Sequence, residues 1–533
     1  MKKFVSMILT GVLTIGLLPT VMMPIRAEEA QVVTELYEKG NFVTSYNPIV
    51  SRHVNGSSRA WRDGLISGNG EIGYVTSGEP YNDAFIFQYN FFNYPSSQPR
   101  EIPAELTGQL EEARENVFNL NDDWLTRDAN GNRRSRTFYY SYHPGHQLRL
   151  KSNYTDTEKD YIRWTNYETA ETGVKFTDKY GTWKRVSFTS QTDGVSITKI
   201  EKSSEESLIN MTISIDDIDD MCKAWDGMSK VSEQRYKKIV PDDGAYIAQS
   251  AHYPSYSASE LIDGGYGGVT YIIAEGENAT KTRITQTKDD PMLLGNNNAV
   301  EIKNAENVYL ITVNDRTSSM TGQTANVMSK FESMTSYTLL DEMLKRVVAV
   351  KDKYTTDGKF SYDAALLPSA EAQKAEFNRM SFDLDGDEEY ESYDNNALIN
   401  VQRNTPDRIN HEFMERAYEQ ARYAQICCGG SLAPRLYGMW VGEWNPGWRS
   451  IYTLDANVNL QVSAMNTGNL SGEFQYGYIT YFLRHAPDFM YNAQMAYGMH
   501  DAIQLSVNID SDRAMHVEYD NSYPFQYWNA GAS

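Results

Sequence analysis

The chain has 533 residues and carries 49 lysines and arginines against 71 aspartates and glutamates, which gives a formal net charge of −22. This acidity argues against a nucleic-acid-binding protein, because neutralising phosphates takes clustered basic residues. With 23% charged and 12% aromatic residues, the chain is not intrinsically disordered. Its 37 tyrosines and 9 tryptophans suit either a surface that meets a polar ligand with apolar faces or a tyrosine-rich all-β domain.

Residues 1–27 have the pattern of a bacterial secretory signal peptide. Lys2 and Lys3 form a positive start, residues 4–23 are mostly apolar, and Ala27 ends a suitable cleavage site. An uncleaved membrane anchor is the alternative, since the apolar run approaches the roughly 18 residues that a span needs. Polar sequence follows at once and favours cleavage. We therefore predict a secreted or cell-surface protein with no transmembrane helix after signal removal.

Residues 28–335 show the alternation that is typical of half-buried strands. Val174 and Phe176, for example, are separated and followed by polar residues. Many short strands with turn residues between them, and few helices, predict a large β-sandwich domain over 28–335. The glycine-rich run 264–268 is interpreted as one of the turns between strands.

The segment from Gly68 to Gly73 formally matches the dinucleotide-binding pattern G-x-G-x-x-G. That motif needs a strand before it, a helix after it and a surrounding βαβ unit. Here Asn69-Gly70 is flanked by strand-like residues on both sides, and Asn-Gly is the strongest short hairpin signal. We predict a β-hairpin at this point and no nucleotide cofactor.

Cysteine and acidic residues give no sign of a metal site. The three cysteines Cys222, Cys427 and Cys428 are too few for a disulfide scaffold and are expected to be buried apolar residues. No Cys/His cluster has zinc spacing. The stretch 383–394 begins like a calcium loop, but Glu388 stands where that loop needs glycine, so a solvated acidic loop is expected.

The hydrophobic period changes to a helical one near residue 338. Leu340, Met343 and Val347 fall on one helical face, which predicts a helical linker over 336–368. From 369 to 533 the pattern is helix-rich, with long aromatic loops between helices. Two of the helices predicted there cover residues 476–485 and 489–499.

Residues 434–470 hold the densest group of candidate site residues. Three tryptophans lie within nine residues, among Gly, Pro and Asn, which no packed helix would favour. Aromatic rings stack on the apolar face of a pyranose, while amides and carboxylates hydrogen-bond its hydroxyls. The alternative is a loop that closes one end of the domain with its tryptophans in the core. We predict a sugar site whose substrate-binding residues are Trp440, Glu443, Trp444, Trp448 and Gln461.

This stretch resembles glycoside hydrolase family 95, whose members include α-L-fucosidases. The family carries a Gly-hydrophobic-Trp segment, then Asn-Pro-x-Trp, Tyr-Thr-Leu and Asn-x-Asn-Leu-Gln. The first residues of the sandwich region and its strands are similar to the family as well, so the resemblance spans most of the chain. The matching segments are 438–440, 445–448, 452–454 and 457–461, supported by Trp61, 65–70, 163–200 and 421–423.

The resemblance implies an N-terminal β-sandwich, a helical linker and an (α/α)6 barrel of the six-hairpin glycosidase type that carries the active site. It also implies inverting hydrolysis of α-L-fucosyl bonds in a glycan, without a cofactor. In that chemistry one carboxylic acid protonates the leaving oxygen and a water attacks from the opposite face, with the carboxyls roughly 6.5–9.5 Å apart. Paired asparagines help to hold the water in the family, and by position this catalytic role falls to Asn457 and Asn459.

The chain also departs from the family pattern. Asp455-Ala456 separates Tyr-Thr-Leu from the first asparagine, where fucosidases run straight on, so a related sugar is an alternative to fucose. The region 369–533 has 165 residues, whereas twelve helices with loops need on the order of 200. We therefore predict a truncated barrel, 369–533, with the catalytic acid and base beyond residue 533. Two alternatives are a non-catalytic carbohydrate-binding protein on the same scaffold and an enzyme that uses Glu443 and Asp455.

Overall fold

The computed structural model describes most of the chain between Gly40 and Ala514. The chain divides into two compact units, 1–34 and 35–533, and every described residue belongs to the second. The predicted signal peptide and Cys222 lie outside the described residues. The described residues are 40–49, 60–92, 108, 111, 114–115, 118–119, 142–202, 208–217, 235–252, 261–286, 297–320, 336–386, 389–430, 432–443, 446–454, 457–470, 473–505, 508–509, 511 and 514.

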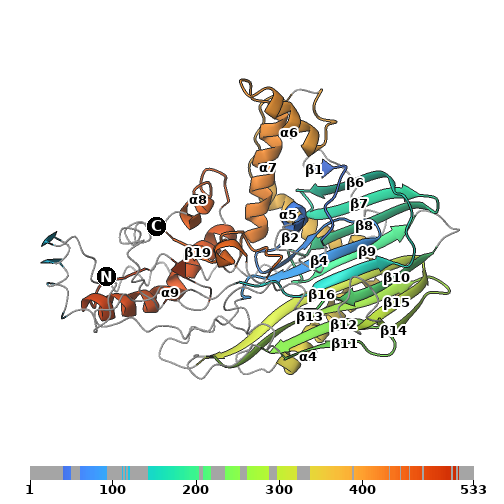
Figure 1. Cartoon of the computed structure of the whole chain (residues 1–533), viewed down its shortest axis with the longest axis horizontal. Helices are drawn as coiled ribbons and strands as arrows, with labels where there is room; N and C mark the ends of the chain where they lie inside the picture. The colour runs from blue at the N-terminus through green and yellow to red at the C-terminus, as the bar shows by residue number, and fades with distance from the viewer. Residues whose placement is uncertain are drawn as a thin grey trace, which may run out of the picture. The chain divides into compact units, whose positions relative to one another are not determined.

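Two sheets, in which every neighbouring pair is antiparallel, occupy the first part of this unit (Figure 1). The nine-stranded sheet has the order β1 (Gly40–Val43), β6 (Lys159–Asn166), β7 (Glu171–Asp178), β8 (Gly181–Thr189), β9 (Ser196–Lys202), β16 (Asn307–Met320), β13 (Leu261–Glu275), β12 (Tyr246–His252) and β11 (Arg235–Ile239). The seven-stranded sheet has the order β14 (Thr280–Gln286), β15 (Asn297–Ala305), β10 (Ile209–Ile215), β5 (Gln147–Ser152), β4 (Asn82–Tyr89), β3 (Ile72–Thr76) and β2 (Leu65–Gly68).

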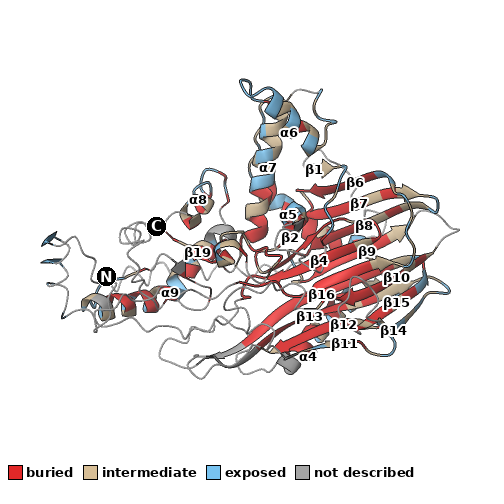
Figure 2. Cartoon of the chain, viewed as in Figure 1, coloured by how far each residue is buried: buried red, intermediate tan, exposed pale blue. Residues whose placement is uncertain are grey.

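The two sheets share an apolar core. Val174 and Phe176 on β7 are buried, whereas Lys175 between them is only half-buried, as the sequence alternation predicts. In the other sheet, Ile213 of β10 is the register partner of Val300 of β15, and both are fully buried. Buried residues run along the strands of both sheets in Figure 2. The predicted β-sandwich is confirmed.

The glycine run 264–268 is not the turn that the sequence predicts. It lies inside β13 and pairs with β12 and β16 on either side. A Cβ on Gly267 would come within 3.0 Å of Met343 Cε, and one on Gly268 would collide with the His146 ring. These glycines are needed because other side chains approach the strand closely, which is the usual reason for glycine within a strand.

Two helices pack on the sandwich after its last strand. Helix α4 (Ser336–Lys353) packs on β13 and β16 with Met343 fully buried, and its Arg346 forms a 2.8 Å ion pair with Asp315 of β16. The short β17 (Thr355–Thr356) and β18 (Lys359–Phe360) lead to α5 (Tyr362–Phe377). Gln373 of α5 donates from Nε2 to the Tyr167 carbonyl at 3.0 Å, which ties this helix to the sandwich.

The remainder of the described chain is mostly helical, so the predicted order of a sandwich followed by a helical region is confirmed. The side chains of Asp394 and Asn410 cap two of the helices by accepting backbone N–H groups. No helix among the described residues is long and apolar enough to cross a membrane. The elements are α6 (Asn395–Asn404), α7 (His411–Cys428), η6 (Gly447–Ser450), β19 (Tyr452–Thr453), α8 (Asn457–Val462), α9 (Glu473–Tyr497) and β20 (Asn508–Ile509).

The prediction of two helices at 476–485 and 489–499 is wrong. A single helix, α9, runs through both segments with Pro487 inside it. Tyr481 and Phe489 on either side of the proline are both buried, so packing of one face outweighs the backbone hydrogen bond that proline removes. The predicted domain bounds, 28–335, 336–368 and 369–533, stay a prediction.

Candidate functional site

The Asn69–Gly70 hairpin, which joins β2 and β3, contacts the end of helix α7. Gly70 donates its N–H to the Cys427 carbonyl at 2.8 Å. A side chain at position 70 would collide with the backbone of Gly429, and the φ of Gly70 is +79°. The predicted hairpin is confirmed. Its contact with α7 also holds in place the start of the segment that follows this helix, residues 429–454, which we call the aromatic segment.

Polar contacts hold that segment against the sandwich. The Trp440 indole donates from Nε1 to the Ser67 carbonyl at 3.2 Å. The next residue, Val441, exchanges two hydrogen bonds with the side chain of Gln88 on β4. Trp440 is only 6% exposed, so its ring lies in the core between the sandwich and the helical region. Its predicted contact with a sugar stays a prediction.

Arg435 lies fully buried within the same segment. Its guanidinium carbon is 3.8 Å from the centre of the Tyr142 ring, and its Nη2 donates to the Met439 carbonyl at 2.6 Å. Burial lowers the pKa of Arg435, and the aromatic face offsets part of the cost of burying its charge. Sequence patterns did not single out Arg435 as a site residue. The signal that could have found it is an arginine among apolar residues such as Leu432 and Leu436.

Gln461 of helix α8 forms hydrogen bonds with the backbone of the aromatic segment. Its Nε2 donates to the backbone carbonyls of Arg435 and Leu436 at 2.7 and 3.2 Å, and its backbone carbonyl accepts from Gln425 Nε2 of α7 at 2.8 Å. The amide nitrogen is therefore engaged with protein backbone. The substrate contact predicted for Gln461 stays a prediction.

The two predicted catalytic asparagines both lie on α8 and are half-buried. Asn457 begins the helix and Asn459 follows two residues later. Residues two apart on a helix do not face each other, whereas Asn457 and Gln461, four apart, share a face. The helical spacing therefore places Asn457 and Gln461 on one face of α8 and Asn459 on another. A shared role for both asparagines in holding one water stays a prediction.

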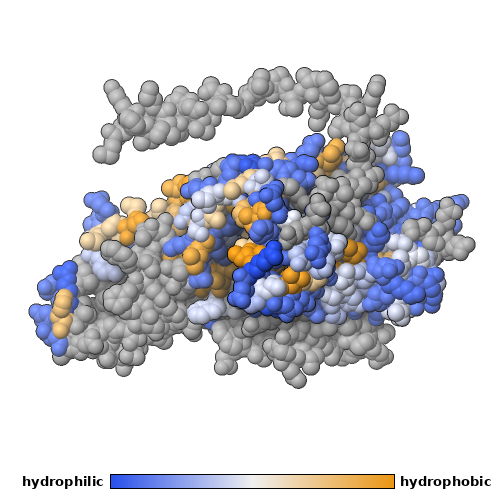
Figure 3. All heavy atoms as spheres, turned by 90° about the horizontal axis from the view of Figure 1, so that it is seen from above, coloured by the Kyte–Doolittle hydropathy of each residue, from blue (hydrophilic) through white to orange (hydrophobic). Residues whose placement is uncertain are grey.

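Trp448 is an exposed aromatic residue among the described residues of the loop 441–454. The residue is 71% exposed, and its backbone adopts a φ of +52°. Arg449 and Ser450 also have positive φ values of +58° and +52°. Each such residue costs on the order of 1 kcal/mol, and strain of this kind concentrates at binding and catalytic sites. On the face drawn in Figure 3, hydrophobic residues form small groups among hydrophilic ones. Independently of that view, the exposed ring of Trp448 is a suitable surface for stacking a sugar ring.

The sandwich contributes two side chains to the same neighbourhood. Arg62 of η2 (Ala60–Asp63) donates to the Tyr437 hydroxyl at 2.9 Å and lies 4.9 Å from the centre of its ring. The Trp61 ring packs so closely on Gly442 that a Cβ there would collide with it. Glu443, next in the chain, is half-buried. Predicted residues Trp444 and Asp455 lie outside the described residues.

Two family models match the chain over the regions described above. A model of the N-terminal domain of glycosyl hydrolase family 65 matches residues 53–315, and a model of the glycosyl hydrolase family 95 catalytic domain matches residues 361–533. The chain resembles glycoside hydrolase family 95. The family 95 match contains the exposed loop, α8 and α9, while the family 65 match covers nearly all of the sandwich.

Two solved structures match the chain at low sequence identity. A putative kojibiose phosphorylase from human microbiome is 9% identical, with 90% of this chain and 54% of that chain covered and a TM-score of 0.49. A family 92 alpha-mannosidase from Bacteroides thetaiotaomicron is 8% identical, with 68% and 37% covered and a TM-score of 0.22. The chain spans about half the length of the phosphorylase. Among curated proteins, no sequence matches the chain.

Proposed function

We propose that the protein is a glycosidase whose sugar site is built by residues 435–461. The observation that carries the proposal is the match to the family 95 catalytic domain over 361–533, which includes the exposed Trp448. A ring that is 71% exposed can stack on a pyranose, and Asn457 lies nine residues further along the chain. Packing against β2 and β4 makes the base of this site rigid, which is what precise recognition requires.

The proposed substrate is an α-L-fucosyl or related glycan, and the proposed reaction is hydrolysis with inversion. In this reaction an acid protonates the leaving oxygen while water attacks the opposite face of the sugar. Asn457 is suited to orient that water, because an amide oxygen accepts a hydrogen bond from it. We further propose that 369–533 belongs to an (α/α)6 barrel and that the protein is exported by the signal peptide at 1–27.

Proton NMR of a digestion of 2′-fucosyllactose tests the proposal. Inversion predicts that the β anomer of fucose is released first and then equilibrates with the α anomer. Asn457→Ala is expected to reduce kcat by about a hundredfold, as removal of a group that positions the nucleophile does. First release of the α anomer, or full activity in Asn457→Ala, would contradict this mechanism.

A non-catalytic carbohydrate-binding protein is the second candidate. The observation that favours it is the placement of Asn457 and Asn459 on opposite sides of α8, which does not suit a shared water. This candidate predicts binding of 2′-fucosyllactose without release of fucose. Release of fucose that is abolished in Glu443→Gln would instead favour Glu443 as an acid within the chain.

A further inference from the structure

Arg62 of η2 is an exposed cation at the edge of the aromatic segment. Its guanidinium carbon lies 5.3 Å from the centre of the Trp61 ring and 4.9 Å from the centre of the Tyr437 ring. The two rings pack edge to face, with their centres 5.9 Å apart. Contact with two aromatic rings holds the cation in one place and leaves its charge in full.

The hydroxyl of Tyr437 connects Arg62 to the loop that carries Trp448. Arg62 Nη2 donates to this hydroxyl at 2.9 Å. The same hydroxyl lies so close to Gly447 that a Cβ there would collide with it. Gly447 directly precedes Trp448, and consecutive Cα atoms are about 3.8 Å apart. Only the Tyr437 hydroxyl therefore separates the guanidinium from the backbone next to the exposed tryptophan.

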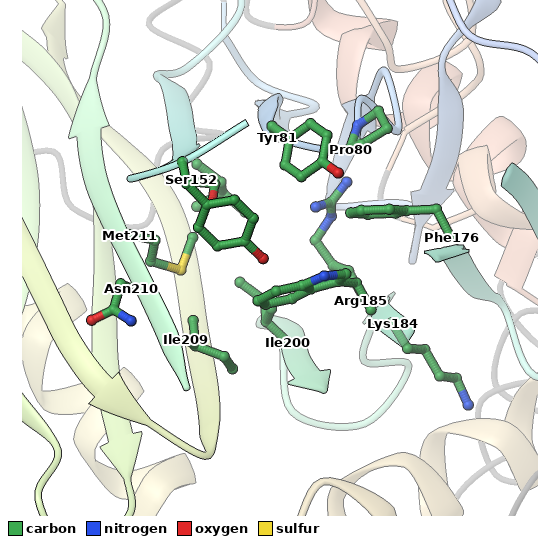
Figure 4. Close-up of a pocket in the computed structure, with 13 residues that line it drawn as sticks. Pro80, Tyr81, Ser152, Phe176, Lys184, Arg185, Ile200, Ile209, Asn210 and Met211 are labelled. Atoms are coloured by element: carbon green, nitrogen blue, oxygen red, sulfur yellow. The ribbon is translucent and has the colours of Figure 1, made fainter. Parts of the chain in front are cut away.

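Arg62 has no carboxylate partner among the residues that the structure describes. Arg185 of β8 shows the contrasting arrangement. In Figure 4 its guanidinium is drawn among aromatic side chains that line the same pocket, including Tyr81 and Phe176. Arg185 is buried and forms an ion pair with Asp83 at 2.5 Å. Burial of an arginine among aromatic rings is thus accompanied by a carboxylate, whereas the exposed Arg62 keeps its charge for another partner.

Most hydrogen-bond donors of Arg62 are open to an anion from solution. A guanidinium has five N–H donors in a planar fork, which suits the oxygens of a carboxylate or a tetrahedral oxyanion. The Tyr437 hydroxyl uses one donor, and no other hydrogen bond of Arg62 is found within the described part of the chain. Asp63, the next residue, accepts from Asn47 instead. An anion that reaches Arg62 therefore displaces no protein group.

The net charge of −22 makes a local cation the only plausible source of anion binding. A chain this acidic repels anions at long range, so it has no general attraction for acidic glycans. A preference for an acidic glycan must then come from a cation that the glycan contacts directly. Arg62 meets this requirement, since it is exposed, held in position and next to the loop of the candidate sugar site.

We propose that Arg62 binds an acidic substituent, a carboxylate or a sulfate ester, on a glycan whose sugar ring stacks on Trp448. The inference rests on the proposed function in placing a glycan at this loop, and it makes Arg62 a specificity-determining residue. Both substituents present negatively charged oxygens, which the guanidinium fork binds through charge-assisted hydrogen bonds. The substrate class of the site is then an acidic glycan, with the sandwich supplying the cation and the aromatic segment supplying the ring.

The test is calorimetric titration of the full-length protein with 3-fucosyllactose, 3-fucosyllactose 3′-sulfate and 3′-sialyl-3-fucosyllactose. The three glycans share the fucose and differ in the substituent on galactose. Wild type is expected to bind at least one acidic glycan about fivefold more tightly than the neutral one, the effect of one exposed charge-assisted contact. Preference for the sulfate alone or for the sialyl glycan alone identifies the substituent. Where a glycan is cleaved, kcat/KM replaces the affinity.

Two variants and one control assign the preference to Arg62. Arg62→Gln removes the charge and keeps a donor for Tyr437, and it is expected to reduce the preference to less than about twofold. Tyr437→Phe keeps the charge and releases the guanidinium, so an intermediate preference is expected even if Arg62→Gln does not fold. The control is Arg403→Gln on α6, an exposed arginine whose loss changes the net charge equally and is expected to preserve the wild-type preference.

Equal binding of neutral and acidic glycans by wild type would overturn the proposal. An undiminished preference in Arg62→Gln would overturn it too, as would an equal loss of preference in Arg403→Gln, because net charge and not position would then be responsible. Binding of 3-fucosyllactose without any preference contradicts this inference alone. Failure of all three glycans to bind contradicts the proposed sugar site as well, so the two failures are distinguishable.

Discussion

The side chain of Gln88 exchanges two hydrogen bonds with the backbone of Val441, although 353 positions separate them in the sequence. Gln88 donates from Nε2 to the Val441 carbonyl at 2.6 Å and accepts the Val441 N–H at Oε1 at 3.3 Å. An amide side chain thus pairs with the main chain as a neighbouring strand would. This pair links the sandwich directly to the segment that carries the candidate site.

Replacing Gln88 by alanine should weaken this junction. The buried N–H and carbonyl of Val441 would both lose a partner, and we expect a loss of about 3 kcal/mol in the free energy of unfolding. Urea denaturation followed by tryptophan fluorescence measures it. The control is Gln494→Ala on the exposed surface of α9, which should change stability by less than about 0.5 kcal/mol. Equal stability of the two variants would show that the pair does not hold the junction.

Gly70→Ala tests the contact between the hairpin and α7. The chain offers a matched control in Gly358, which has nearly the same φ, +78° against +79°, but no atom near its missing side chain. Gly358→Ala should cost about 1–2 kcal/mol from backbone strain alone. Gly70→Ala should cost about 2 kcal/mol more, because its Cβ would also collide with Gly429. Equal losses in chemical denaturation would refute a close contact at the hairpin.

The buried carboxyl of Glu171 should make stability depend on pH. Burial raises the pKa of Glu171 from its usual 4.5 to about 7, while the hydroxyl of Tyr362, which donates to it at 2.9 Å, works in the opposite direction. Below about pH 4.5 the group is protonated in both the folded and unfolded states, so it adds no pH dependence. Between about pH 4.5 and 7 only the unfolded state ionises, and stability falls as pH rises.

Glu171→Gln removes this titration and keeps an acceptor for Tyr362. The variant should match wild type near pH 4.5 and exceed it by up to about 3 kcal/mol above pH 7. Burial also raises the pKa of Glu79 to about 7, but that group is present in both proteins and cancels in the difference. Denaturation of both proteins across this pH range checks the prediction. A difference that stays constant with pH would contradict it.

The two described tryptophans of the site should behave differently on substitution. Trp448→Ala should change the free energy of unfolding by less than about 0.5 kcal/mol, because the ring is exposed. It should weaken glycan binding about tenfold through loss of the stacking surface. Trp440→Phe should instead cost about 1–2 kcal/mol in stability, since the Ser67 carbonyl loses its donor. Thermal unfolding and calorimetric titration separate the two effects, and the reverse assignment of losses would refute this division.

Local sequence patterns predicted the sandwich because burial on one face of a strand has a fixed period of two. They did not predict the close approach of Met343 to Gly267, which depends on a helix far along the chain. The same limit applies to the aromatic loop. Its composition indicated an exposed sugar-binding surface. In the structure Trp440 is buried and contacts the distant Ser67, whereas Trp448 is exposed.

The asparagines show a different limit. The family resemblance assigned one shared role to both asparagines by their positions in the sequence, whereas residues two apart on a helix such as α8 do not face each other. Helix formation over six residues is decided by packing, with Val458 and Val462 buried beneath it, and not by the propensity of asparagine. Sequence patterns therefore pointed to this segment as the candidate site but did not determine how its polar groups are arranged.

Hydrogen–deuterium exchange with and without 2′-fucosyllactose tests whether the glycan binds at the Trp448 loop, because it locates the bound sugar in the chain. We expect slower amide exchange in peptides covering 446–462 of wild type, and no such slowing in Trp448→Ala under the same conditions. Unchanged exchange over 446–462 in wild type, or equal protection in Trp448→Ala, would contradict a glycan site at this loop.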